Sequence, residues 1–445
     1  MYSPEVEKAL ESAGAHIGDI IRIQRGSEVY EGILLPRSEY GDPSCIVIKL
    51  SSGYNIGVKY TPGTVIKRLR KAAEVGKFPA KKAERKPSLP PVSLIATGGT
   101  IGSRVDYVTG GVYMCVKPEE LLYLTPELED AVYIERMRSP FLVASEDLTP
   151  DDWKEIAEIA AKELNTDVRG VVITHGTDTM HYTSAALSFM LRNLSKPVAL
   201  VGAQRSPDRG SFDGAMNLLC AAHYAARSDI AEVAIVMHGE SSDTYCYAIR
   251  GTKARKMHTS RRDTFRPIND LPLARVWPDG RIEALNTKYR KRGSSEVYAD
   301  TAFEKRVAIV KAYPGSDPEV IDYYVDKGYR GIVIEGTGFG HTPVYPRAEK
   351  LSWLPSIKRA VEESVALVMT SQALYGRTNP YVYRNARVLK QAGVVYVEDM
   401  LTEVAYVKLG WVLGHTQDPK EVESLMLTDI AGEISSRTLF NTYLI

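Results

Sequence analysis

Two short glycine-containing stretches carry hydroxyl side chains that could act as nucleophiles. The first is Thr97-Gly98-Gly99-Thr100, which directly follows the apolar run Leu94-Ile95-Ala96. Such a run is typical of a buried strand, and ligands bind beyond the carboxyl ends of strands in open parallel sheets. The two glycines leave backbone N–H groups uncovered, where they could stabilise a developing oxyanion. The stretch therefore makes Thr100 a candidate nucleophile, although glycine-rich loops of this kind also occur in nucleotide-binding domains.

The second stretch is His175-Gly176-Thr177-Asp178-Thr179, which follows a further apolar run at 170–174. If both runs are parallel strands, both loops can open on the same edge of one sheet. A hydroxyl beside a carboxylate supplies a nucleophile or water-activating group, together with an anion that can hold an amine. The alternative for Thr177 and Asp178 is that they cap the helix that follows.

A third stretch, residues 250–265, is dense in Arg and Lys, and most of these residues are expected on a solvated basic face. A lysine that lies close to Asp178 and is partly desolvated could instead lose its proton and serve as a base. Spacing alone does not show that contact, so both interpretations stay open.

Alternating strands and helices are expected to position these loops. Strands are predicted at 170–174, 196–201, 232–237, 307–311, 331–335 and 365–370, and helices at 213–225, 318–327, 355–363, 385–391, 400–413 and 419–427. Such alternation is typical of parallel sheets with helices on both faces. Residues 271–301 lack clear periodicity, and we interpret them as the connection between two α/β lobes.

The first 70 residues have a different character. Ser3-Pro4-Glu5 predicts a helix start, and five brief β-like runs follow at 19–25, 29–35, 44–50, 54–59 and 64–69. Short strands joined by tight turns predict a small all-β barrel over residues 1–70. Residues 71–91 are basic and proline-rich, and a solvated linker is preferred to an RNA contact.

Composition restricts the class of protein. The chain has 445 residues, of which 44% are hydrophobic and 25% charged, with a formal net charge of +1. These values are ordinary for a soluble globular protein and predict no global attraction to nucleic acid. No apolar run reaches the roughly 18 residues that a membrane span needs, and the first residues lack a signal peptide's apolar segment. The four cysteines (Cys45, Cys115, Cys220 and Cys246) are widely spaced, so we expect no metal site and a reducing, cytoplasmic setting.

Together and in this order, Thr97-Gly98-Gly99-Thr100-Ile101 and His175-Gly176-Thr177-Asp178-Thr179 resemble the two signatures of bacterial-type asparaginases and glutaminases. The resemblance extends from about Pro91 to the end of the chain. It implies an asparaginase-like α/β body with two parallel-sheet lobes, an N-terminal lobe over 92–290 and a C-terminal lobe over 305–445.

The resemblance also implies roles for individual residues. Thr100 matches the acyl-accepting threonine and Tyr107 its tyrosine partner, while Thr177, Asp178 and Lys256 match the second catalytic group. Ser145 matches the serine that grips the substrate's α-carboxylate. Glu146 stands where the family often has Gln, and either Glu146 or Asp178 could pair with the α-ammonium group.

A small barrel, a linker and an asparaginase-like body, with about 90 residues before the first threonine loop, resemble the D-subunit branch of archaeal-type glutamyl-tRNA(Gln) amidotransferases. This resemblance implies a glutaminase that passes ammonia to a partner E subunit. That subunit would use ATP and Mg²⁺ to convert Glu-tRNA(Gln) to Gln-tRNA(Gln), so no cofactor is expected in this chain.

The resemblance further implies an assembly. We expect a homodimer, with Gly336-Thr337-Gly338-Phe339-Gly340-His341 as the candidate contact, within a heterotetramer that binds tRNA(Gln) through the complex. The alternative is a free cytoplasmic L-asparaginase, which would leave the N-terminal barrel without a role.

Overall fold

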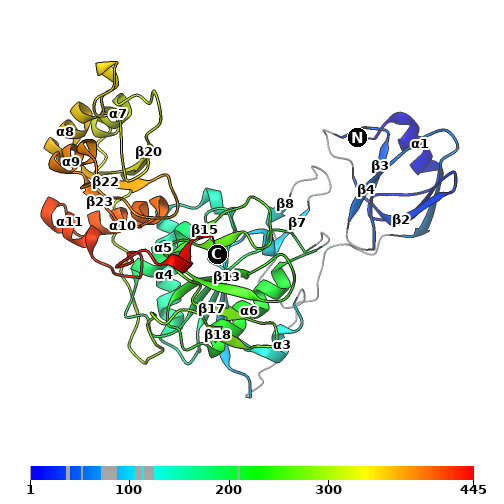
Figure 1. The fold of residues 1–445 in the computed structure, drawn as a ribbon. Helices are drawn as coiled ribbons and strands as arrows, with labels where there is room; N and C mark the ends of the chain where they lie inside the picture. Colours follow the sequence, from blue (N-terminus) through cyan, green and yellow to red (C-terminus); the bar gives the residue numbers. More distant parts are fainter. Residues whose placement is uncertain are drawn as a thin grey trace.

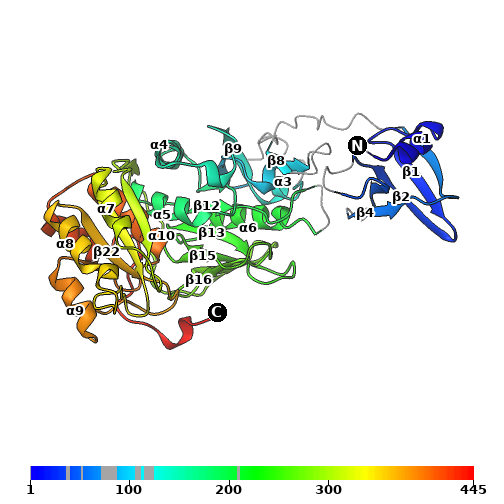
Figure 2. The ribbon, with the colours of Figure 1, turned by 90° about the horizontal axis from the view of Figure 1, so that it is seen from above.

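The computed structural model describes residues 2–36, 41–51, 54–71, 88–105, 112–114, 125–207 and 211–444. Tyr107, Cys115 and most of the expected linker lie outside these residues. Figures 1 and 2 show the N-terminal domain at one end of the molecule, the C-terminal lobe at the other, and the lobe with both threonine loops between them. No helix among the described residues is long and apolar enough to cross a membrane.

The N-terminal domain is an antiparallel sheet with one helix, α1 (Pro4–Ser12). The helix begins where expected because the Ser3 side chain accepts the backbone N–H of Val6. The sheet has the order β4-β3-β2-β1-β5. Its strands are β1 (Ile20–Arg25), β2 (Glu28–Leu34), β3 (Cys45–Lys49), β4 (Asn55–Lys59) and β5 (Val65–Arg70). The expected antiparallel β region at the start of the chain is thus confirmed, while closure of its strands into a barrel stays a prediction.

The central lobe contains an eight-stranded mixed sheet in the order β18-β17-β14-β13-β12-β10-β6-β9. The five strands from β13 to β9 are parallel to one another, and β14, β17 and β18 each pair antiparallel with their neighbours. The strands are β6 (Pro91–Ala96), β9 (Tyr133–Arg138), β10 (Val171–Thr174), β12 (Val198–Val201), β13 (Val233–His238), β14 (Cys246–Arg250), β17 (Ala274–Val276) and β18 (Ile282–Ala284).

Helices cover both faces of this sheet, so alternate residues of one strand pack into different hydrophobic cores. Val171 and Ile173 of β10 pack in the core with α4 (Pro150–Leu164) and α5 (Met180–Met190), whereas Val172 packs in the core with α6 (Gly214–Arg227). A strand buried on both faces is an uninterrupted apolar run, which is why β10 is recognisable from sequence.

Residues 271–301, which we interpret from the sequence as the connection between two lobes, also form part of the central lobe. This stretch supplies β17 and β18 to the edge of the main sheet, and β19 (Tyr298–Ala299) pairs with β11 (Leu191–Arg192). These strands are two or three residues long, too short for alternation to be visible in the sequence.

The C-terminal lobe is a parallel four-stranded sheet in the order β20-β21-β22-β23. Its strands are β20 (Val307–Lys311), β21 (Gly331–Gly336), β22 (Ala366–Ser371) and β23 (Val395–Tyr396), and its helices are α7 (Glu319–Asp326), α8 (Leu354–Glu362), α9 (Arg384–Gln391), α10 (Thr402–Leu413) and α11 (Pro419–Leu427). Helix α10 packs against α5 of the central lobe, where the Phe189 and Trp411 rings stack with centroids 6.2 Å apart. Helix α10 therefore joins the two lobes.

Candidate active site

The two threonine loops lie side by side because β6 and β10 are parallel neighbours that end at the same edge of the sheet. The Thr97 Oγ1 hydroxyl donates to the Thr174 carbonyl at 2.8 Å. A Cβ on Gly99 would lie only 2.5 Å from the backbone N of Gly176, and Gly99 has a φ of +89°. Only glycine fits this close approach without strain. Thr100, the first residue of a short 3₁₀ turn (Thr100–Gly102), is thereby placed next to the second loop.

Thr177, Asp178 and Lys256 form one hydrogen-bonded group. Lys256 ends β15 (Ala254–Lys256), which pairs with β16 (Phe265–Pro267), and its Nζ donates to Thr177 Oγ1 at 2.9 Å and to Asp178 Oδ1 at 2.7 Å. The side chain of Lys256 is 11% exposed, so it does not belong to a solvated basic face. Thr179, not Thr177 or Asp178, is the N-cap residue of α5. The group joins a hydroxyl, an amine and a carboxylate, which can exchange protons.

Ser145 and Glu146 lie on a third loop that packs against the second. Ser145 is buried, its Oγ accepts the backbone N–H of Thr179 at 3.4 Å, and its carbonyl accepts the Thr179 hydroxyl at 2.6 Å. A Cβ on Gly176 would lie 2.7 Å from Ser145 Oγ, so the two loops touch there too. Glu146, the next residue, is exposed. Its carboxylate is therefore open to solvent beside a buried serine.

His175 supports the second loop from inside the lobe. It is fully buried, with Nδ1 2.7 Å from the Gly176 carbonyl and Nε2 2.8 Å from Thr183 Oγ1. Burial lowers the pKa of His175 to about 4, so the ring is neutral near pH 7. A neutral ring can donate from Nδ1 and accept at Nε2, which matches these two neighbours.

The sequence analysis missed a fourth loop, which follows β12. A Cβ on Gly202 would lie 2.9 Å from Thr177 Cγ2. The buried Asp213 carboxylate accepts the backbone N–H groups of Gln204 at 3.1 Å and Arg205 at 3.0 Å, and so fixes this loop. Burial raises the pKa of Asp213, and these backbone hydrogen bonds oppose the rise. The sequence contains a signal for this loop. A parallel strand is predicted at 196–201, and its carboxyl end must lie at the same edge of the sheet as those of the strands before the two threonine loops.

Tyr107 lies outside the described residues, so the structure does not place it. Within the described part of the chain, no group of three or more His, Cys, Asp and Glu side chains is arranged to hold a metal ion.

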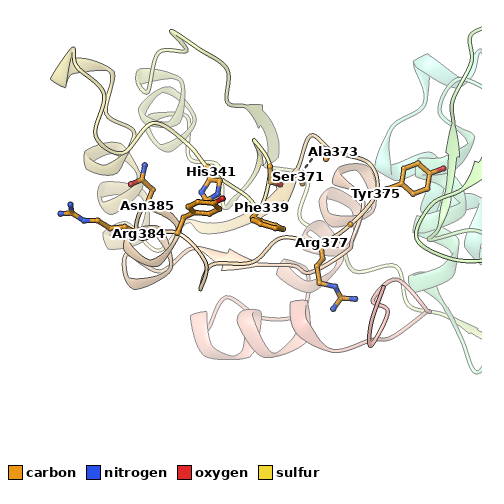
Figure 3. Close-up of a pocket in the computed structure, with 11 residues that line it drawn as sticks. Phe339, His341, Ser371, Ala373, Tyr375, Arg377, Arg384 and Asn385 are labelled. Atoms are coloured by element: carbon orange, nitrogen blue, oxygen red, sulfur yellow. Dashed lines mark hydrogen bonds between the residues drawn. The ribbon is translucent and has the colours of Figure 1, made fainter. Parts of the chain in front are cut away.

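A separate cavity of about 680 Å³ lies in the C-terminal lobe, beyond the carboxyl ends of β21 and β22. Figure 3 shows Phe339, His341 and Arg384 around it, and Ser371 and Arg377 also line it. The cavity thus contains part of the expected dimer contact at 336–341 and none of the predicted catalytic residues. Its place in the lobe agrees with the rule that ligand-binding crevices in open parallel sheets lie beyond the carboxyl ends of the strands.

Three family models match the chain in succession. The GatD N-terminal domain matches residues 15–69, the N-terminal asparaginase domain residues 91–290, and the glutaminase/asparaginase C-terminal domain residues 306–426.

Curated relatives match along nearly the whole chain. The D subunit of the glutamyl-tRNA(Gln) amidotransferase of Thermococcus kodakarensis is 54% identical over 445 residues, covering 99% of this chain and 99% of that protein. The corresponding D subunit of Pyrococcus furiosus is 55% identical over 447 residues, covering 99% of this chain and 100% of that protein.

Solved structures match the body of the molecule. The L-asparaginase of Thermococcus kodakarensis superposes with a TM-score of 0.70 at 32% identity, and L-asparaginase I of Vibrio cholerae with 0.67 at 31%. Each match covers 78% of this chain and 100% of the asparaginase.

Proposed function

Because the chain belongs to the family of glutamyl-tRNA(Gln) amidotransferase D subunits, which are asparaginase-type glutaminases, we propose how its threonine loops hydrolyse glutamine. A free asparaginase is not favoured, because relatives that are named as D subunits align along the N-terminal domain as well as the body. The observation that carries the proposed chemistry is the position of Lys256 Nζ, bonded to Thr177 and Asp178 beside the loop of Thr100.

Thr100 is the nucleophile in this proposal. Its hydroxyl attacks the side-chain amide carbon of glutamine, and backbone N–H groups of the glycine-rich loop stabilise the oxyanion. An unactivated threonine hydroxyl is a poor nucleophile, so a base must take its proton, and Tyr107 is the proposed base or relay. The proton taken from the Thr100 hydroxyl is passed to the amide nitrogen, so that the carbon–nitrogen bond breaks and ammonia leaves as the acyl-enzyme forms.

Thr177, Asp178 and Lys256 form the proposed second catalytic group. Lys256 lies within hydrogen-bonding distance of Thr177 Oγ1, so a proton can pass between them as the deacylating water attacks. Asp178 orients the Lys256 ammonium through its 2.7 Å contact. The Asp178 side chain is still 66% exposed, which leaves it able to hold the α-ammonium of the substrate as well.

Ser145 and Glu146 are proposed to hold the amino-acid end of the substrate. Ser145 lies against Gly176, one residue before Thr177, so a carboxylate that it binds would lie beside the second catalytic group. The exposed Glu146 carboxylate is suited to an α-ammonium rather than to a carboxylate, since like charges repel.

We propose that two copies of the chain associate through their C-terminal lobes, so that the lobe of one copy completes the site of the other. Two exposed aromatic side chains that line the C-terminal cavity support this interface: Phe339 is 42% exposed and Tyr383 55%. Exposed aromatic residues of this kind are typical of protein interfaces.

The remaining assignments follow from family membership. We propose that the chain works in the cytoplasm with an E subunit in a heterotetramer that binds tRNA(Gln), and that ATP and Mg²⁺ act in the E subunit. The chain itself then needs no cofactor, and its ammonia is transferred to the partner.

The test is steady-state hydrolysis of glutamine and of asparagine by the chain alone, with the E subunit, and with the E subunit plus Glu-tRNA(Gln). We expect glutamine to be preferred and kcat/KM to rise when the partner and the charged tRNA are present. Equal kcat/KM for glutamine in all three conditions would contradict a coupled subunit, and a preference for asparagine would support a free asparaginase.

A further inference from the structure

The hairpin that carries Lys256 contacts the C-terminal lobe through an ion pair directly beside the catalytic lysine. Arg255, the preceding residue on β15, lies 2.9 Å from Glu403 of α10 through its NH2 and Oε1 atoms. Successive side chains of a strand point to opposite sides, so Lys256 reaches Thr177 and Asp178 while Arg255 reaches the helix. The position of Lys256 is thereby linked to α10.

Helix α10 also supports the other half of the same catalytic group. It packs against α5, which begins directly after the Thr177–Asp178 loop, and the Tyr182 and Tyr406 rings meet edge to face with centroids 6.2 Å apart. The two segments of chain that must meet at the Lys256–Thr177 hydrogen bond therefore rest on one helix.

The Arg255–Glu403 contact is buried at the Glu403 carboxylate, half-buried at Arg255, and only partly satisfied in its hydrogen bonds. The Glu403 side chain is 9% exposed and that of Arg255 27%, and both Arg255 Nε and Glu403 Oε2 are buried without a hydrogen-bond partner. Hydrophobic contacts and the buried Lys253–Asp399 ion pair also hold the two lobes together, so the Arg255–Glu403 contact is not needed to join them. An ion pair in this partly buried position adds little to the free energy of folding, and is better suited to holding the β15 hairpin in one position against α10.

We propose that Arg255 and Glu403 are positioning residues for the glutaminase reaction, which hold Lys256 at hydrogen-bonding distance from Thr177 and Asp178. The proposal rests on the proposed function of Lys256. Neither Arg255 nor Glu403 is assigned contact with the substrate; both act through Lys256.

The charges around the pair agree with this role. Burial raises the pKa of Glu403, and the Arg255 charge opposes that rise. The other titratable groups that face the pair are Glu335 of β21 and His181 and Tyr182 of α5. Glu335 is paired with Lys311 at 3.0 Å, and burial keeps His181 neutral by lowering its pKa to about 3. Arg255 is thus the cation that faces Glu403 from the catalytic hairpin.

The test uses the full chain in complex with its partner subunit and the isosteric variant Glu403→Gln, which keeps the shape and removes the charge. We expect kcat for glutamine to fall about 10- to 100-fold, as for a misplaced catalytic group, with a much smaller change in KM. Arg255→Gln and the double variant Arg255→Gln/Glu403→Gln should give the same loss, because the two residues act as one unit.

Glu433→Gln is the matched control. Glu433 pairs with Lys408, which lies on the same helix α10, and both side chains are fully buried. Their other hydrogen bonds go to backbone groups at residues 426–431 and not to the catalytic hairpin. This variant should lower the melting temperature and leave kcat of the folded enzyme unchanged.

The deciding measurement is Glu403→Gln in a Lys256→Met background, with glutamic acid γ-hydroxamate as an activated substrate that keeps slow turnover measurable. If Glu403 acts through Lys256, the second substitution causes little further loss. Equal losses in both backgrounds, or wild-type kcat for Glu403→Gln, would overturn the positioning role. Wild-type activity of Lys256→Met alone would instead reject the proposed function of Lys256.

Discussion

Replacing Lys256 by arginine separates catalysis from folding. Lys256→Arg keeps a positive charge that can still pair with Asp178, but a guanidinium does not give up its proton near neutral pH. If Lys256 transfers a proton in the reaction, kcat should fall about 10²- to 10⁴-fold, which is the usual contribution of a general acid or base and equals about 3–5 kcal/mol of activation free energy.

The loss of folding free energy from the same change should be smaller. The Asp178 side chain is 66% exposed, so its ion pair with Lys256 is screened by water and contributes about 0–1 kcal/mol. The hydrogen bond to Thr177, which is only 5% exposed, contributes about 1 kcal/mol. The free energy of unfolding should therefore fall by no more than about 2 kcal/mol, a shift of a few degrees in Tm.

The assay is ammonia release from glutamine at saturating substrate, together with calorimetry on the same samples. Arg261→Lys is the control, because Arg261 is a neighbouring cation on the same basic stretch, 54% exposed and paired with Asp263. The control should keep kcat and Tm close to wild type. A Lys256→Arg enzyme with kcat within about threefold of wild type would refute the proton-transfer role.

Three further predictions concern other parts of the molecule. Thr100→Val keeps the shape of the side chain but lacks the hydroxyl, so mass spectrometry of quenched reactions should show no acyl-enzyme while the fold is retained; wild-type turnover would exclude Thr100 as nucleophile. The pKa of His175 is about 4 in the folded protein, against about 6.5 in the unfolded chain. Between these pH values the unfolded state binds more protons than the folded state. The contribution of His175 to the free energy of unfolding is therefore fully present above pH 6.5 and falls by up to about 3 kcal/mol as the pH drops towards 4. Denaturant unfolding at pH 7 and pH 4.5 should show a smaller pH-dependent loss for His175→Gln than for wild type, and equal losses would show that His175 does not contribute. Phe339→Glu should shift light scattering from dimer to monomer while a Phe440→Glu control does not, and an unchanged dimer would exclude the C-terminal cavity as the interface.

The order of elements was predictable where burial leaves a strong pattern. Strand β10 is apolar throughout because helices cover both faces of the sheet, so its place and the loop after it could be predicted from residues 170–179. The helix start at Ser3-Pro4 was predictable for a different reason, because capping depends on neighbours in the sequence alone. The short antiparallel strands β17 and β18 had neither signal, and only their pairing with β14 identifies them.

The site shows the same division between local and long-range information. The sequence pattern placed Thr100 and Thr177 after parallel strands whose loops can open on the same edge of one sheet. Lys256 is 79 positions from Thr177 in the sequence, and only the fold brings its amine within 2.9 Å of the hydroxyl. Asp213, which fixes the loop after β12, has no motif of its own because it holds that loop through the backbone N–H groups of Gln204 and Arg205. Sequence motifs thus identify residues that lie together on one loop. They do not identify a residue such as Asp213, which holds another segment of the chain in place.

This division also explains why Arg255 and Glu403 could not be found from the sequence. Arg255 lies within residues 250–265, which are rich in cations, and composition predicts that such residues are solvated. Only the packing of α10 between the lobes places Glu403 opposite Arg255 rather than opposite another cation of that stretch. The residue that reaches Thr177 and the residue that reaches α10 are neighbours in the chain, so under the proposed positioning role a displacement of either lobe along this helix moves the amine of Lys256. The proposed catalytic centre would then depend on how the two lobes meet, which is a property of the fold and not of the threonine motifs.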